Sequence, residues 1–190
     1  MDSIENAKQK IRAVIAGSKV PEDRIHAENT LEWLLKLDPK AGQALQISAL
    51  GHDIDRADEA RKVRRADYDD YDEFKAAHAR NGSTILRTIL GMCGVARPIA
   101  DEACRLVTLH EVGGDPRSDL LRDADCISFF DFNLPLYYQR EGWEETMRRC
   151  IWGCGRLSGR LKKIVKKITY EDETLTQLLK NAIQQACLKD

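Results

Sequence analysis

Four histidines spread along the chain are the residues with the clearest capacity for chemistry. They are His26, His52, His78 and His110, and each lies in or beside a stretch with helical periodicity. Asp53 directly follows His52, and the triplet Asp123, Ala124, Asp125 comes soon after His110. Imidazoles with carboxylates suit divalent metals such as Mn, Fe, Co, Ni or Zn, whereas Mg and Ca prefer oxygen ligands alone. The pattern therefore indicates a metal-ligand set carried by successive helices.

Apolar residues at helical spacing predict the elements that must position these side chains. Helices are expected over residues 3–16, 21–37, about 40–50, 73–90, 98–110 and 118–129, the last capped by Ser118 or Asp119. Beyond Pro135 an aromatic segment leads to a helix around 144–152, a basic helix to 168 and a last helix over about 172–188. No segment has the pattern of a strand. The sequence therefore predicts an all-α fold in which His52 and Asp53 stand at or just past a helix end.

Length, composition and charge limit the class of protein. A chain of 190 residues with 43% hydrophobic and 32% charged residues suits one soluble helical domain over 1–190. Its 30 basic and 31 acidic residues leave a net charge of -1, so overall charge predicts no nucleic-acid partner. Without a signal-like N-terminus or a run of 18 apolar residues, we expect a cytoplasmic protein with no membrane partner. The oligomeric state is left open.

The six cysteines are predicted to be structural. None forms a C-x-x-C pair, and a chain of this length needs no disulfides to build its core. Cys150 and Cys154 have helical i, i+4 spacing, but no histidine is near them in sequence to complete a zinc site with four ligands. We expect them to be small buried apolar side chains.

Residues 54–72 form a charged stretch with few apolar side chains, which predicts a long surface loop or lid. It is either a solvated connection or the source of a phosphate-binding group. Arg56 is favoured for that role because it lies three residues after Asp53, and Arg61 and Lys62 are further candidates for substrate binding.

The order His26, His52 with Asp53, then Asp125 resembles the H...HD...D signature of the HD-domain superfamily of metal-dependent phosphohydrolases. The resemblance covers about residues 20–130, with the helices of 134–190 expected to pack on this motif core. His78 and His110 resemble the additional histidines of the dinuclear members. The resemblance implies an all-helical bundle and an enzyme, a phosphatase, nucleotidase or phosphodiesterase, that hydrolyses a small phosphomonoester or nucleotide.

The same resemblance implies roles for individual residues. A single ion would be held by His26, His52, Asp53 and Asp125, and in a dinuclear site Asp53 bridges to a second ion on His78 and His110. A water activated by the metal attacks phosphorus while Arg56 stabilises phosphoryl charge. Asp123 is left outside the ligand set, because residues two apart on a helix face different directions.

The chain departs from parts of the family and leaves alternatives open. Residues 111–116 replace the Gly-Tyr-Pro signature of the cyclic-dinucleotide phosphodiesterases, and Arg56 stands where a lysine is common. A di-iron oxygenase and a non-catalytic regulatory module are the alternative functions. The basic residues between 156 and 167 predict a solvated face of an amphipathic helix.

Overall fold

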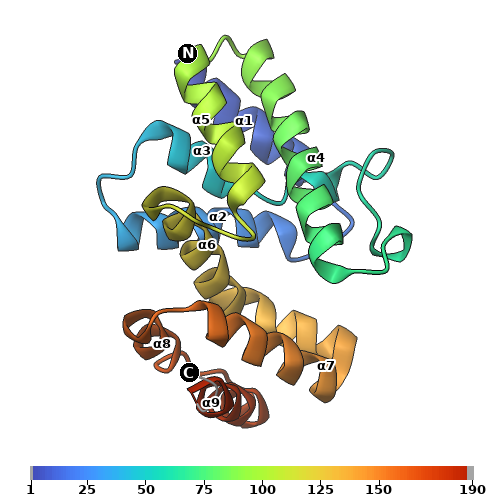
Figure 1. Cartoon of the computed structure of the whole chain (residues 1–190), viewed down its shortest axis with the longest axis vertical. Coiled ribbons are helices and arrows are strands. Elements are labelled where there is room, and N and C mark those ends of the chain that lie inside the picture. The colour runs from blue at the N-terminus through green and yellow to red at the C-terminus, as the bar shows by residue number, and fades with distance from the viewer. Residues whose placement is uncertain (1, 188–190) are drawn as a thin grey trace. The chain divides into compact units, whose positions relative to one another are not determined.

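The computed structural model describes residues 2–187, and all regular secondary structure in that part of the chain is helical, as predicted (Figure 1). The chain divides into two compact units, Met1–Ala124 and Asp125–Asp190. All four histidines belong to the first unit. The packing of residues 134–190 on the motif core stays a prediction.

The first unit is built around the short helix α3 (Gln43–Gly51), which is buried on all sides. Its sequence has no charged side chain and is mainly apolar, which is the composition expected of a helix enclosed by other helices. Helices α1 (Ser3–Ile15), α2 (Asp23–Leu37) and α5 (Arg97–Leu109) pack against it. The C-terminus of α3 therefore ends inside the unit, and this end carries His52 and Asp53.

Helices α1 and α4 (Tyr71–Met92) follow local sequence signals closely. In α1 the residues Ile4, Ala7, Ile11 and Ile15 are buried at helical spacing, and Asp2 caps the helix by accepting a hydrogen bond from the Ile4 backbone nitrogen. Asp70 caps α4 in the same way through the Glu73 nitrogen, at 2.8 Å. Helix α4 lies alongside α5 (Figure 1), which brings His78 toward the end of α3.

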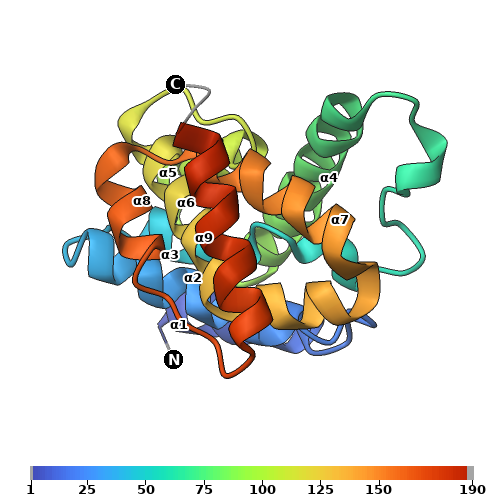
Figure 2. The ribbon, with the colours of Figure 1, turned by 90° about the horizontal axis from the view of Figure 1, so that it is seen from below.

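The predicted surface loop contains two single-turn helices, η1 (Ile54–Ala57) and η2 (Arg65–Asp67). We name residues 58–70 the 58–70 loop. It projects to the side of α4 in both ribbon views (Figures 1 and 2), and most of its residues are exposed. Its polar composition therefore matches its position in solvent.

Helix α6 (Pro116–Ser128) begins earlier than predicted, so the expected cap at Ser118 or Asp119 is wrong. The Asp115 carboxylate caps it instead, accepting hydrogen bonds from the backbone nitrogens of Arg117 at 3.0 Å and Ser118 at 3.2 Å. Asp115 precedes Pro116, and proline is well suited to the first helical position. Pro116 therefore marks the start of α6.

The second unit contains the π-helical turn η3 (Phe129–Asn133) and helices α7 (Leu134–Arg156), α8 (Gly159–Val165) and α9 (Glu173–Cys187), of which α7 and α9 pack together (Figure 2). The predicted aromatic segment is helical and forms the start of α7. Gly142 interrupts α7 at φ 75°, a conformation that favours glycine. Leu188, the predicted end of the last helix, lies outside the described residues.

None of the helices in residues 2–187 combines the length and apolar character that a membrane span requires.

Candidate metal centre

The end of α3 presents His52 into the interior of the first unit. The side chain is fully buried, and its Nδ1 lies 2.9 Å from the Ala49 carbonyl oxygen, which accepts a hydrogen bond from it. This contact turns Nε2 toward His26 on α2, with 3.3 Å between the two Nε2 atoms. Helices α2 and α3 thus bring two imidazoles, 26 residues apart in sequence, to one point.

Asp53, the next residue, directs its two carboxylate oxygens to different histidines. Its Oδ2 lies 3.5 Å from Nε2 of His52 and 3.9 Å from Nε2 of His26. Its Oδ1 lies 2.9 Å from Nε2 of His78 and 3.9 Å from Nε2 of His110. One carboxylate therefore stands between two pairs of imidazoles.

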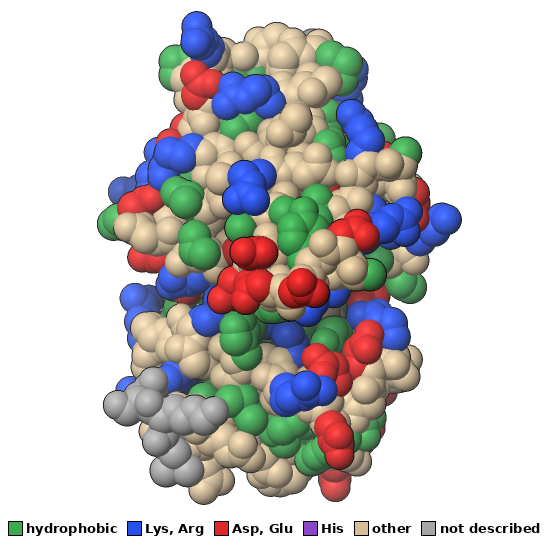
Figure 3. Space-filling view, turned by 45° about the vertical axis from the view of Figure 1, so that its right-hand side comes forward, with side chains coloured by type: hydrophobic (Ala, Val, Ile, Leu, Met, Phe, Trp, Pro, Cys, Tyr) green, Lys and Arg blue, Asp and Glu red, His purple; other side chains and the backbone are tan. Residues whose placement is uncertain are grey.

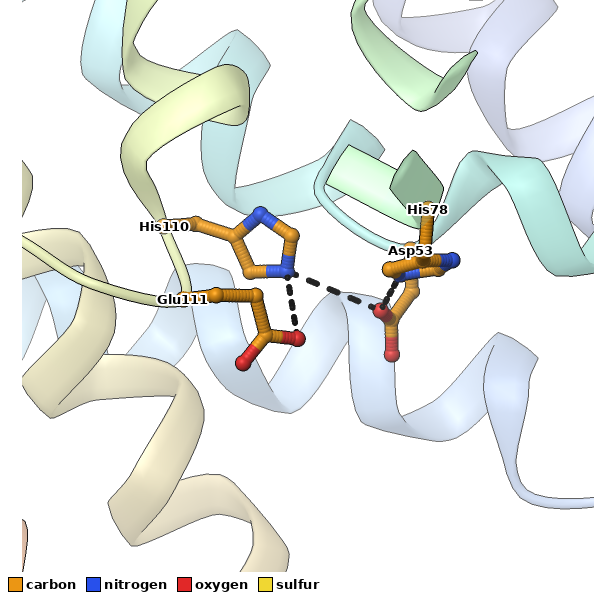
Figure 4. Close-up of side chains that lie close together, drawn as sticks. All are labelled: Asp53, His78, His110 and Glu111. Atoms are coloured by element: carbon orange, nitrogen blue, oxygen red, sulfur yellow. Dashed lines mark hydrogen bonds and ion pairs between the residues drawn. The ribbon is translucent and has the colours of Figure 1, made fainter. Parts of the chain in front are cut away.

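His78 lies on α4 and His110 lies at the end of α5. A hydrogen bond at Nδ1 orients each ring. The His78 Nδ1 lies 2.9 Å from Asp55 Oδ2, and the His110 Nδ1 lies 2.7 Å from the Val107 carbonyl oxygen. Both side chains are buried, and their Nε2 atoms turn toward Asp53 (Figure 4). No histidine colour appears on the face drawn in Figure 3, as their burial predicts.

Glu111 is a component of the centre that the sequence analysis missed. One of its oxygens lies 3.2 Å from Nε2 of His110 (Figure 4), and the Lys75 ammonium pairs with the same oxygen. The signal was present in the sequence, because His110-Glu111 is a second histidine-acid doublet at a helix end, like His52-Asp53. Asp53, His78, His110 and Glu111 each offer a ligand atom within 4.8 Å of one another.

The donor set fits a metal ion. Ligand atoms about 2.1 Å from one ion, in tetrahedral or octahedral array, lie about 3.0 to 3.4 Å apart, and the Nε2 atoms of His26 and His52 are 3.3 Å apart. The buried His110 Nε2 makes no hydrogen bond among residues 2–187, and the Glu111 oxygen 3.2 Å away is in ion-pair range only. Buried polar nitrogens normally have a partner, and an ion would supply one. A hydrogen-bonded Nδ1 is also the arrangement that prepares a histidine to ligate through Nε2.

The charge of the Asp53 carboxylate agrees with this assignment. Burial by itself raises the pKa of the Asp53 carboxyl, but the Arg56 guanidinium and then the His52 and His78 imidazoles lower it well below its usual range. Burial likewise lowers the pKa of His78, but its hydrogen bonds to Asp53 and Asp55 outweigh this effect and raise it. Asp53 is therefore ionised at neutral pH, as a metal ligand must be.

Arg56 lies directly beside the centre. Its guanidinium is 3.0 Å from Asp53 Oδ2 and 3.2 Å from Oδ1 of the buried Asp23. It also lines a pocket of about 410 Å³ that reaches His78 and Asp55. The basic side chains of this pocket are Arg56, Lys62, Arg64, Arg65 and Lys75. The pocket is therefore suited to an anion.

Two of the remaining predicted residues, Arg61 and Asp123, lie elsewhere in the first unit. Arg61 pairs with Asp58 at 2.6 Å and lines a separate hollow with residues of α1 and α4. Asp123 pairs with Arg122 at 3.2 Å. Asp125 is buried on α6 and is the first residue of the second unit, so its place in the ligand set stays a prediction.

A model of a domain of unknown function, DUF4202, matches residues 2–183, which is nearly the whole chain. The chain belongs to the DUF4202 family. No curated protein and no solved structure was found to match it. In this DUF4202 domain the matched residues include every histidine and both histidine-acid doublets.

Proposed function

We propose that the protein is a metal-dependent phosphohydrolase of the HD type that acts on a small phosphorylated substrate. The observation that carries the proposal is the position of Asp53, whose two oxygens face the His26–His52 pair and the His78–His110 pair separately. A carboxylate so placed is suited to bridging two ions. We name the two groups the His26 side and the His78 side.

On the His78 side, Glu111 adds a second carboxylate. On the His26 side we propose Asp125 as the further ligand. In support, it follows Ala124, whose side chain is buried in the core of the first unit. The mixed nitrogen and oxygen donors favour Mn, Fe, Co, Ni or Zn.

When bound, such ions supply Lewis acidity toward a phosphoryl oxygen and a water molecule that is nucleophilic near neutral pH. The protein's own residues then orient and hold the substrate. The Asp53 carboxylate fixes the imidazoles of both sides, and the buried Asp23 orients the Arg56 guanidinium at the edge of the pocket. In that position Arg56 can donate two parallel hydrogen bonds to a phosphate.

The pocket supports phosphate rather than dioxygen chemistry. A di-iron oxygenase of the HD type would use the same shared carboxylate, so the ligands alone favour neither activity. Five basic side chains line the neighbouring pocket, and Asp55 is the one acid among the residues that line it. This charge favours an anionic substrate, and with the four converging histidines it also argues against a non-catalytic module.

The decisive experiment is a screen of phosphomonoesters and nucleotides with Mn²⁺, Co²⁺, Ni²⁺, Zn²⁺ and Fe²⁺ added separately to protein stripped of metal. We expect phosphate release that requires one or more of these ions and is lost in Asp53→Asn. Mixed-valent iron after aerobic purification, with no phosphate release under any condition, would replace this proposal with the oxygenase.

A further inference from the structure

Asp55 is a buried carboxylate, 1% exposed, that lies in η1 two residues after Asp53. It accepts hydrogen bonds from three groups at once. The donors are Nδ1 of His78 at 2.9 Å, the backbone nitrogen of Val63 at 3.3 Å, and the side-chain amide of Asn81. These donors belong to two different parts of the molecule, since His78 and Asn81 are on α4 and Val63 is in the 58–70 loop.

The first of these contacts determines how His78 can act. In the neutral imidazole the contact with Asp55 keeps the proton on Nδ1, which leaves the lone pair of Nε2 for an ion that would replace the hydrogen bond to Asp53. A carboxylate behind a ligating histidine holds the ring in place and makes it a better donor to the metal. Asp55 therefore prepares His78 for the ion on the His78 side.

The other contacts attach the 58–70 loop to the same carboxylate. Asn81 donates to Asp55 and also to the Arg61 carbonyl oxygen, at 2.9 Å. The loop is thus tied at Arg61 and at Val63 to a pair of side chains, Asp55 and Asn81, that lie beside the imidazole. The segment from Lys62 to Ala66 forms one wall of the basic pocket. The position of this wall and the orientation of His78 therefore depend on one carboxylate.

We propose that Asp55 is a positioning residue that couples metal binding on the His78 side to the order of the 58–70 loop. This inference rests on the proposed metal site. An ion on Nε2 strengthens the Nδ1–H donor and holds His78, and so Asp55, in one arrangement, which favours the loop contacts. By reciprocity, an ordered loop raises the affinity of that ion. The pocket wall then closes into its binding form only when the metal is present.

Limited proteolysis with trypsin tests the coupling without relying on activity. The loop carries four cleavage sites, Arg61, Lys62, Arg64 and Arg65. Their cleavage is measured by mass spectrometry before and after Mn²⁺ or Ni²⁺ is added, and cleavage elsewhere in the chain serves as the internal standard. In the wild type we expect the ion to slow cleavage of the loop by about fivefold or more.

In Asp55→Asn the ion should no longer protect the loop. The ion on the His78 side should bind about 10- to 100-fold more weakly, as when other groups behind metal-ligating histidines are removed. The ion on the His26 side should remain. At saturating metal, Asn81→Ala should lose the protection while still binding two ions, which provides a test even if Asp55→Asn does not fold.

Asp58→Asn is the matched control. Asp58 is an acid of the same loop that pairs with Arg61 and does not touch His78, so this variant should keep both ions and the metal-dependent protection. The inference is overturned if the wild type binds metal with no change in loop cleavage, or if Asp55→Asn is protected like the wild type. Absence of metal binding in the wild type would instead overturn the proposed metal site itself, and the coupling with it.

Discussion

The two units of the molecule differ in the metal-binding side chains that they contain. The first holds all four histidines, with Nε2 atoms directed at a shared carboxylate. The second has no histidine but has four of the six cysteines, Cys126, Cys150, Cys154 and Cys187, the first three of them buried. Residue type alone would make both units candidates for a metal site.

The environments of these side chains separate the two units. Burial raises the pKa of the Cys126, Cys150 and Cys154 thiols to about 12. At neutral pH they remain protonated, and a thiol must lose its proton to ligate a metal. An imidazole ligates as the neutral base, a form that is accessible to histidine near neutral pH. The comparison therefore teaches that the electrostatic surroundings, more than the residue type, decide which cluster can bind a metal ion.

The largest effect is expected from Asp53→Ala. Because its two oxygens face both histidine pairs, this change should remove both ions and abolish activity, while helical content measured by circular dichroism stays close to that of the wild type. Asp101→Ala is the matched control, since Asp101 forms an exposed ion pair with Arg87 at 2.6 Å and should retain all bound metal. Wild-type metal content in Asp53→Ala would contradict the shared-carboxylate site.

Single-histidine variants should affect the two bound ions separately. His78→Ala should lose the ion of the His78 side, and His26→Ala should weaken the ion of the His26 side, so metal analysis should fall from two ions toward one in each case. If the wild type binds one ion and His78→Ala retains it, the centre is mononuclear and the oxygenase alternative is removed.

Arg56→Ala should affect catalysis without affecting metal. Loss of a charge-assisted hydrogen bond to phosphate should lower kcat/KM by about 10- to 100-fold while metal content is unchanged. Arg87→Ala, which removes an exposed guanidinium paired with Asp101, should leave the kinetics unaltered. Unchanged kinetics in Arg56→Ala would indicate that another basic side chain of the pocket binds the phosphate.

The smallest effect on metal is expected in the second unit. Cys126→Ala should keep all bound metal and lose about 1 kcal/mol of stability, because it removes a buried sulfur that donates to the Gly153 carbonyl oxygen. In the native protein the exposed Cys187 thiol should react rapidly with a thiol reagent. Cys187→Ser should abolish this rapid phase of the reaction. Metal loss in Cys126→Ala would contradict the conclusion that the cysteines of the second unit do not bind metal.

The sequence by itself determined the helices and most of the candidate ligands. Apolar residues at helical spacing, such as Ile4, Ala7 and Ile11, predict a buried helix face regardless of the partner. Four histidines beside such helices, with Asp53 adjacent to one of them, were sufficient to predict a cluster able to hold a metal ion and the helix end that carries it. These are local signals, because the spacing of side chains on a helix depends on the helix alone.

Only the tertiary structure decided how the helices meet. The two directions of the Asp53 oxygens, the inclusion of Glu111, and the three donors shared by Asp55 all depend on the approach of α2, α4 and α5 to the end of α3. Arg61 and Lys62 are neighbours in sequence but line different hollows, since adjacent residues of an irregular loop have no fixed relative direction. Most of these contacts join residues more than 20 positions apart, and spacing along the chain carries no information about those.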